Sequence, residues 1–372
     1  MRIFHARVLI GDRFVPGGVE FGEKFRRCGA DVTDGEVDAE GAYLIPGLID
    51  IHTHAAMGED ASDGRAEAFP VMSRYYARDG VTSWCPTTMT LKEPVLTAAM
   101  KAIRSFRRPE GGAKIAGVNL EGPFLCYEKR GAQAAENLAL PDVGMFRRLN
   151  DACGGMVRLV TVAPEQPGAM EFIREVSKIC TVSLGHSTAD YDTAMAAYAA
   201  GASHATHLFN AMPQLMHREP GIVGAARDSG ASAELICDGL HIHPSVVRIV
   251  FELFGERTVL ISDSLRCAGM PEGEYTLGGQ PITYRGGKAT LKGTDTLAGS
   301  SIHLMDGVRR AVSFGIPLEK AVFAASTAPA RVIGRQDDLG SIAPGKCADF
   351  LLLDEDLNLK AVYIDGSISQ FV

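Results

Sequence analysis

The stretch YLIPGLIDIHTH, residues 43–54, decides the fold and raises a question about function. An apolar, β-rich run ends there in two histidines, His52 and His54, that are separated by one residue. Side chains two positions apart on a strand point to the same face, so both imidazoles share one side. The pair is therefore either part of a metal site or two hydrogen-bonded histidines of a strand. The rest of the chain decides between these interpretations.

Seven more β-rich runs follow the first. The eight runs are 43–54, 81–90, 114–124, 157–164, 178–187, 204–212, 232–241 and 258–264. Most are separated by stretches with helical patterning, such as 66–79, 91–107, 190–200 and 244–254. Near-continuous apolar strands that alternate with helices predict a parallel sheet covered on its outer face. Eight such units predict an α/β fold, a closed (β/α)₈ TIM-like barrel over residues 43–339.

The two chain ends do not follow this pattern. Residues 1–42 and 340–372 are rich in short β-like runs separated by Gly, Asp and Pro-Gly turns. Neither end is long enough to fold alone, so we expect both to pair into one small β-sandwich domain beside the barrel. After the last barrel strand we expect a hairpin-like insert at 274–292, then helices near 302–314 and 318–333.

Composition excludes several classes of partner. The 372 residues carry a formal net charge of −8, which argues against a surface for nucleic acid or anionic membranes. No segment has about 18 consecutive apolar residues, as a membrane span requires. The first residues lack the pattern of a signal peptide, and the eight cysteines are scattered without a C-x-x-C pair. We therefore expect a cytoplasmic protein with reduced thiols.

Ionisable side chains end the predicted strands, where barrel enzymes place their chemistry. They are His52, His54, Glu121, His186, His207, His241 and Asp263. Burying any of them without a partner would be costly. For one histidine alone, a hydrogen-bonded core residue is the better interpretation. Five candidates that converge on one rim, the first five of these residues, favour a divalent metal such as Zn²⁺ or Fe²⁺, with Glu121 able to bridge two ions.

Several motifs resemble those of one enzyme family. They are PGLIDIHTH, NLEGPF, SLGHS, THLFNAMPQLMHREPG, CDGLHIHP, ISDS and TLAGSS. In this order, over nearly the whole chain, they are similar to the N-acetylglucosamine-6-phosphate deacetylases of the amidohydrolase superfamily. The combination of LEGPF and HLFNAM is specific to that family, whereas the HxH pair marks only the superfamily. The resemblance implies metal-dependent hydrolysis of the acetamide of N-acetyl-D-glucosamine 6-phosphate, which gives glucosamine 6-phosphate and acetate in amino-sugar catabolism.

The resemblance also implies roles for particular residues. Glu121, His186 and His207 match the metal ligands of the family. His52 and His54 match a pair that holds a second ion in some members and is absent in others, so one or two ions per subunit are expected.

Asp263 matches the family's catalytic acid/base, which would take a proton from an activated water and pass it to the leaving amine. Locally, Asp263 before Ser264 also fits a helix N-cap. Arg218 and His241 match positions that hold the sugar phosphate from a neighbouring subunit, which implies a homodimer. Sequence alone would favour a surface salt bridge for Arg218. The other matched substrate positions are Ala132, Gln133, Asn210, Ala211, Leu297, Ala298 and Gly299.

Gln133 departs from the family pattern. In the family a histidine usually occupies this place and donates to the substrate carbonyl, whereas here the stretch reads RGAQ. A glutamine amide donates a hydrogen bond but cannot become a cation. Gln133 therefore keeps open a deacetylase for N-acetylgalactosamine 6-phosphate. Two further alternatives are a hydrolase of cyclic amides, which Arg218 and His241 disfavour, and a non-catalytic sugar-phosphate-binding relative, which Asp263 and the candidate ligands disfavour.

Overall fold

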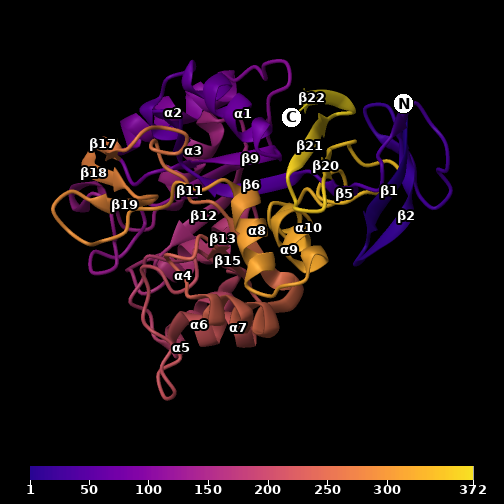
Figure 1. Ribbon diagram of the computed structural model, residues 1–372. Coiled ribbons are helices and arrows are strands. Elements are labelled where there is room, and N and C mark those ends of the chain that lie inside the picture. The colour runs from indigo at the N-terminus through magenta and orange to yellow at the C-terminus, as the bar shows by residue number, and fades with distance from the viewer. Residues whose placement is uncertain (372) are drawn as a thin grey trace.

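Eight parallel strands form the barrel of the computed structural model, which describes residues 1–371 (Figure 1). In order around the sheet they are β6 (Leu48–Thr53), β9 (Val81–Thr88), β11 (Val118–Glu121), β12 (Val157–Val162), β13 (Thr181–Leu184), β14 (His204–Ala205), β15 (Ser232–Ile236) and β16 (Thr258–Ile261). Every neighbouring pair in this order is parallel. The eight units expected from the sequence are confirmed.

The barrel closes between β16 and β6 just beyond the strands. Within residues 1–371 no strand ladder joins these two; instead, the backbone N–H of Asp263 donates to the carbonyl of His52 at 2.9 Å. The N–H of His54 donates to the carbonyl of Ser264 at 3.1 Å. These bonds place Asp263 directly beside the two histidines of β6.

Helices cover the outside of the barrel. They are α1 (Ala68–Arg78), α2 (Glu93–Ser105), α3 (Val143–Ala152), α4 (Ala169–Val176), α5 (Tyr191–Ala200), α6 (Gly221–Ser229), α7 (Pro244–Phe254), α8 (Leu304–Ser313), α9 (Leu318–Ala325) and α10 (Thr327–Val332). Each presents an apolar face to the strands: Phe172, Ile173 and Val176 of α4, for example, are fully buried. Side-chain caps fix some starts, as where Asp190 accepts from the N–H of Thr193 before α5.

The sixth barrel strand is much shorter than the run 204–212 predicts. Strand β14 ends at Ala205 because His207, Phe209 and Ala211 adopt positive φ values of 25°, 74° and 52°. Such values break a strand and turn successive side chains in new directions. The irregular segment that results lies at the rim of the barrel.

Both chain ends form a second, separate sheet. Its strands are ordered β22 (Ser367–Phe371), β21 (Leu359–Ile364), β20 (Phe350–Leu353), β5 (Tyr43–Pro46), β1 (Arg2–Ile10), β2 (Arg13–Phe21) and β3 (Phe25–Gly29), with β4 (Val37–Asp38) paired to β1. The stretch 43–54 is thus divided, β5 joining this sheet and β6 the barrel. At the division, a Cβ on Gly47 would lie 2.2 Å from Oγ1 of Thr82, so only glycine fits there.

The small sheet folds over on itself. Phe21 on β2 and Phe350 on β20 are separated by two intervening strands, yet their ring centroids are 5.0 Å apart. In a flat sheet three strand spacings would separate them by about 14 Å. Tyr363 stacks on Phe350 at 4.4 Å, and Phe25 packs nearby at 5.7 Å. The expected fold class, a barrel with a small β unit built from both chain ends, is confirmed; the boundaries 1–42 plus 340–372 and 43–339 stay a prediction.

An insert follows the last barrel strand, as expected. It is a three-stranded antiparallel sheet of β17 (Gly273–Leu277), β18 (Gln280–Arg285) and β19 (Lys288–Leu291). The remaining short elements are β7 (Ala55–Ala56), β8 (Glu59–Asp60), β10 (Lys114–Ile115) and 3₁₀ turns at Ala61–Asp63, Ala135–Asn137 and Gly255–Arg257. None of the helices within residues 1–371 combines the length and the hydropathy that a bilayer crossing needs.

Candidate metal centre and active site

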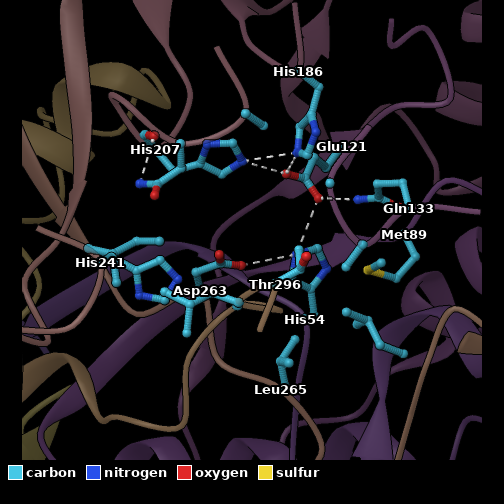
Figure 2. Close-up of a pocket in the computed structure, with 18 residues that line it drawn as sticks. His54, Met89, Glu121, Gln133, His186, His207, His241, Asp263, Leu265 and Thr296 are labelled. Carbon is cyan, nitrogen blue, oxygen red and sulfur yellow. Dashed lines mark hydrogen bonds and ion pairs between the residues drawn. The ribbon is translucent and has the colours of Figure 1, made fainter. Parts of the chain in front are cut away.

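A polar cavity opens at the carboxyl ends of the barrel strands. Figure 2 shows imidazoles and carboxylates from several strands pointing into it. Six of the seven ionisable residues predicted at strand ends line it; the exception, His52, is fully buried. The strands therefore gather these side chains as the sequence predicts.

One group of three ligand-type residues consists of Glu121, at the end of β11, and two histidines that face one of its oxygens. Nε2 of His186 and Nε2 of His207 each lie 3.1 Å from Oε1 of Glu121, and 3.1 Å from each other. The Nδ1 of His186 is 2.8 Å from the carbonyl of Lys129, to which only an N–H can donate. When its ring is neutral, His186 therefore carries its proton on Nδ1 and directs the lone pair of Nε2 at the group, as a metal ligand does.

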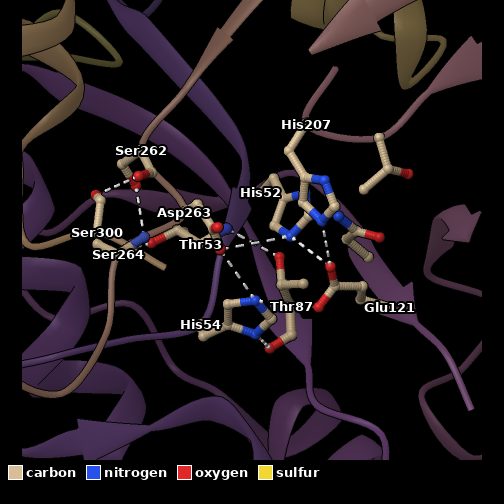
Figure 3. A network of polar contacts seen from close by, with 12 residues as sticks. His52, Thr53, His54, Thr87, Glu121, His207, Ser262, Asp263, Ser264 and Ser300 are labelled. Atoms are coloured by element: carbon tan, nitrogen blue, oxygen red, sulfur yellow. Dashed lines mark hydrogen bonds and ion pairs between the residues drawn. The ribbon is translucent and has the colours of Figure 1, made fainter. Parts of the chain in front are cut away.

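A second group adjoins the first and shares Glu121 with it. Nε2 of His54 lies 3.3 Å from Oε2 of Glu121, and Nε2 of His52 lies 3.4 Å from Oε1 (Figure 3). The other nitrogen of each ring has a partner: Nδ1 of His54 is 3.2 Å from the carbonyl of Thr87, and Nδ1 of His52 is 2.8 Å from Oε2 of Glu234. Both rings thus aim Nε2 at Glu121.

This donor set fits a divalent metal. In each group the three candidate ligand atoms lie within 4.8 Å of one another, and all the residues are buried. Nε2 of His52 is completely enclosed and has no hydrogen-bond partner among the described residues. A buried polar atom left in this state is costly, and a cation between the converging lone pairs removes the cost. Imidazoles with one carboxylate suit Zn²⁺ and Fe²⁺.

The pKa values of the buried groups also support a cation-binding site. Burial by itself raises the pKa of Glu121, but the charge of His52 and hydrogen bonds from His186 and His207 hold that pKa well below its usual range. Burial by itself lowers the pKa of His54, yet its bonds to Asp263 and Glu121 raise it to about 9. Protons on the imidazoles thus balance the buried carboxylates. A divalent cation would replace those protons, so metal binding should release them.

Asp263 stands at the end of β16, beside this centre. Its Oδ1 lies 3.3 Å from Nε2 of His54 and 3.7 Å from Nε2 of His52. Its backbone has a φ of 51°, and its carbonyl accepts from the N–H of Ser300 at 2.7 Å. The alternative that Asp263 caps a helix is wrong, because the next helix of any kind within residues 1–371 is α8, which begins at Leu304.

Most of the predicted substrate residues face the same cavity. They are Ala132, Gln133, Asn210, Ala211, His241, Leu297 and Gly299, while Ala298 is buried between the last two. His241 is oriented by Asp238, whose Oδ2 lies 2.7 Å from Nδ1 of His241. Arg218 is the exception. It lies outside the cavity, in a separate groove at the start of α6 beside Glu219 and Pro220.

The sequence is similar to those of known enzymes. A family model described as "Amidohydrolase family" matches residues 43–369. The chain is 37% identical to the N-acetylgalactosamine-6-phosphate deacetylase of Escherichia coli O157:H7, over 90% of this chain and 89% of the relative. It is 36% identical to the N-acetylglucosamine-6-phosphate deacetylase of Bacillus subtilis, over 88% and 85% respectively.

The chain belongs to the amidohydrolase family. Solved structures agree. An N-acetyl-D-glucosamine-6-phosphate deacetylase mutant from Mycobacterium smegmatis, in complex with N-acetyl-D-glucosamine 6-phosphate, superposes with a TM-score of 0.93 at 31% identity, and the match covers 99% of each chain. The likeness therefore extends over the barrel and the small sheet together.

In this amidohydrolase, Gln133 turns its amide toward the metal centre. Its Oε1 accepts from the backbone N–H of Thr90 at 2.8 Å, which fixes the orientation of the amide. Its Nε2 then donates to Oε2 of Glu121 at 2.7 Å. One of the two amide hydrogens remains for another acceptor. Gln133 thus holds Glu121 in place and keeps one donor at the cavity.

Several cavity residues were not predicted from the sequence. They are Met89, Gly131, Ile236, Leu265, Leu277 and Thr296. Leu277 belongs to the insert and Thr296 to the loop that follows β19, and no periodicity in the sequence shows that this region folds back over the rim. Glu234 was also missed, although one signal was available: it is an acid within the otherwise apolar strand SAELI of β15.

Proposed function

We propose that this amidohydrolase hydrolyses the acetamide of N-acetyl-D-glucosamine 6-phosphate, giving glucosamine 6-phosphate and acetate in amino-sugar catabolism. One observation carries the proposal: ring nitrogens of four histidines converge on Glu121, with the carboxylate of Asp263 3.3 Å from His54 at the same cavity. The enzymes named for this reaction among its relatives and its structural neighbours support it.

A divalent metal held by this cluster supplies, when bound, a more acidic water and a polarised substrate carbonyl. The chain's own residues do the rest. Asp263 accepts a proton at Oδ1 and later donates it to the nitrogen of the leaving amine. Burial raises the pKa of Asp263, but hydrogen bonding from His54 and the charges of His52 and His54 lower it below its usual range. The carboxylate therefore starts the reaction ionised, as a base must.

We propose two ions per subunit, Zn²⁺ or Fe²⁺. The two groups each supply three ligand atoms. Oε2 of Glu121 faces His54, whereas Oε1 faces His186, His207 and, at 3.4 Å, His52. A carboxylate placed in this way would be able to hold two cations at once. Gln133, which donates to Oε2, supports that bridging orientation.

Substrate recognition is assigned to the residues around the cavity. The backbone and side chains of Ala132, Gln133, Asn210, Ala211, Leu297, Ala298 and Gly299 would hold the sugar. The imidazole of His241, oriented by Asp238, would hold the phosphate together with Arg218. Because Arg218 lies outside the cavity of its own subunit, we propose that it reaches the cavity of a partner in a homodimer.

The surroundings of Arg218 support that assembly. Leu215 and Met216, in the same loop, are 45% and 49% exposed, and Leu240 beside His241 is 51% exposed. The adjacent exposed apolar side chains of Leu215 and Met216, close to Arg218 in the chain, favour a protein contact. A cytoplasmic location fits the proposed substrate, a phosphorylated sugar of metabolism.

A substrate panel tests the proposal. Metal-reconstituted enzyme should release acetate fastest from N-acetylglucosamine 6-phosphate, more slowly from N-acetylgalactosamine 6-phosphate, and least from the sugars without phosphate. Preference for the galactosamine epimer would establish the alternative deacetylase, which the named relatives do not favour as a group. Binding without release of acetate from any member would contradict an enzymatic role.

A further inference from the structure

Glu234 is a buried acid to which the reaction described above gives no part. It lies on β15 with its side chain directed into the barrel, and it is fully buried. Its Oε2 is 2.8 Å from Nδ1 of His52 and 3.0 Å from the backbone N–H of His207. One carboxylate oxygen thus contacts one residue of each ligand group.

The contact with His52 decides which nitrogen faces the centre. A carboxylate can only accept, so Nδ1 of His52 must carry the proton, and the lone pair of the neutral ring is on Nε2. That nitrogen is the one directed at Glu121. Carboxylates bound to the outer nitrogen of a metal-ligating histidine fix its ring and raise its basicity.

The contact with His207 is of a different kind. There Glu234 accepts from the main chain, at the residue whose positive φ turns the chain away from β14. This bond holds the backbone, whereas the His207 imidazole is set by its own torsions. Glu234 should therefore act on the His52 group through a side chain and on the His207 group only through the backbone.

A third histidine occupies the remaining side of the carboxylate. Nε2 of His204 lies 3.2 Å from Oε1 of Glu234, while Nδ1 of His204 is 2.7 Å from Oγ of Ser232. His204 contacts no member of either ligand group in the described hydrogen bonds. It offers a matched control, because changing it disturbs the same buried carboxylate from the side away from the metal centre.

We infer that Glu234 is a positioning residue that orients His52 and thereby secures the ion of the His52–His54–Glu121 group in preference to the other ion. The inference rests on the proposed metal centre. A simple core ion pair between Glu234 and His52 is the alternative. It would stabilise the fold without distinguishing one ion from the other.

Stepwise metal binding distinguishes the two. The wild type, Glu234→Gln and His204→Gln would be stripped of metal and titrated with Co²⁺, recording visible absorption, metal content per subunit and the rate of loss to a chelator. Glutamine keeps the shape of Glu234 and one acceptor for His52 but removes the charge. We expect Glu234→Gln to weaken one of two Co²⁺ equivalents by about 10–100-fold and to change its absorption, with the second equivalent nearly unaffected. His204→Gln should lower thermal stability and leave both affinities within about threefold.

The outcomes separate the inference from the proposed function. Two equivalents bound by Glu234→Gln with wild-type affinities and spectra would overturn the inference and leave the function standing. Parallel weakening of both ions in Glu234→Gln and in His204→Gln would also overturn it, in favour of the core ion pair. A wild type that binds one equivalent would remove the second ion and the inference with it. A wild type that binds none would overturn the proposed function itself.

Discussion

The rim of the barrel and the core of the small sheet are buried to the same degree but are built from opposite chemistry. At the rim, His52, Glu121 and Glu234 are 0%, 2% and 0% exposed. In the small sheet, Phe21 and Phe350 are 1% and 0% exposed. Burial of aromatic rings stabilises a fold directly, whereas burial of ionisable groups costs free energy unless every group has a partner. The difference shows which region is shaped by stability and which by chemistry.

The partners at the rim also show how that cost is met. Imidazoles face carboxylates across the two ligand groups, and backbone groups fix the outer nitrogens of His54 and His186. At the seam between β16 and β6, Oγ of Ser262 donates to Asp50, which burial leaves with a pKa raised to about 7. The small sheet needs no such network. Changes in the two regions should therefore have different consequences.

Replacement of the proton carrier should have the largest effect on activity. In Asp263→Asn the side chain keeps its size but can no longer accept a proton, so kcat should fall by about 10²–10⁴-fold or more while KM stays similar. Steady-state rates and metal content should be measured on the same sample. Near-normal turnover with metal retained would rule out Asp263 as the base.

Replacing His52 and His54, at the end of β6, tests whether they bind a metal ion. The double change His52→Asn and His54→Asn removes two of the three ligands of one group, so metal content should fall from about two equivalents to about one. Elemental analysis of metal-replete protein measures this. The single change Thr53→Ser, between the two, serves as a control that should keep both equivalents. Two equivalents in the double variant would contradict the assignment of this group.

Arg218 tests the expected link between subunits. Arg218→Ala should raise KM for phosphorylated substrate by about tenfold or more, since a hydrogen bond to a charged group contributes roughly 1.5–3 kcal/mol. The unphosphorylated sugar lacks the charge and should be affected little. Kinetics on both substrates provide the measurement. Equal losses on the two would show that Arg218 has a structural role.

A change in the core of the small sheet should lower stability and leave turnover unchanged, in contrast to changes at the rim. Phe350→Ala removes a ring that contacts Phe21, Phe25 and Tyr363, and should lower the free energy of unfolding by about 3–5 kcal/mol. Turnover per folded molecule should stay near the wild-type value, because no atom of the cavity changes. Chemical denaturation followed beside activity tests this. A large loss of kcat in fully folded protein would break the distinction between the two regions.

The sequence predicts much of the architecture because apolar runs and their spacing are local properties. The eight strand–helix units and the polar residues at strand ends could be predicted from these patterns. The structure brings those polar residues together at the rim of the barrel. Other features depend on contacts that sequence spacing does not reveal. The division of 43–54 between two sheets depends on how Gly47 packs against Thr82. The early end of β14 depends on residues with positive φ, such as His207.

The site was predicted unevenly for the same reason. Candidate ligands such as His186 lie in motifs whose position on a strand is predictable. Leu277 reaches the cavity from the insert and Thr296 from the loop after it, and the path of both over the rim is set by tertiary packing. Glu234 was missed because a lone acid in an apolar strand shows that a partner is needed without showing which one. The partner, His52, is 182 residues away in the chain.

Removal of the metal tests the central claim most directly. The protein should be stripped with a chelator, checked for metal content and for unchanged circular dichroism, and assayed for acetate release from N-acetylglucosamine 6-phosphate before and after Zn²⁺ or Fe²⁺ is restored. A centre built from Glu121 and the four rim histidines predicts that activity disappears with the metal and returns with it, while the fold stays intact. Full activity in protein shown to contain no metal would contradict the account.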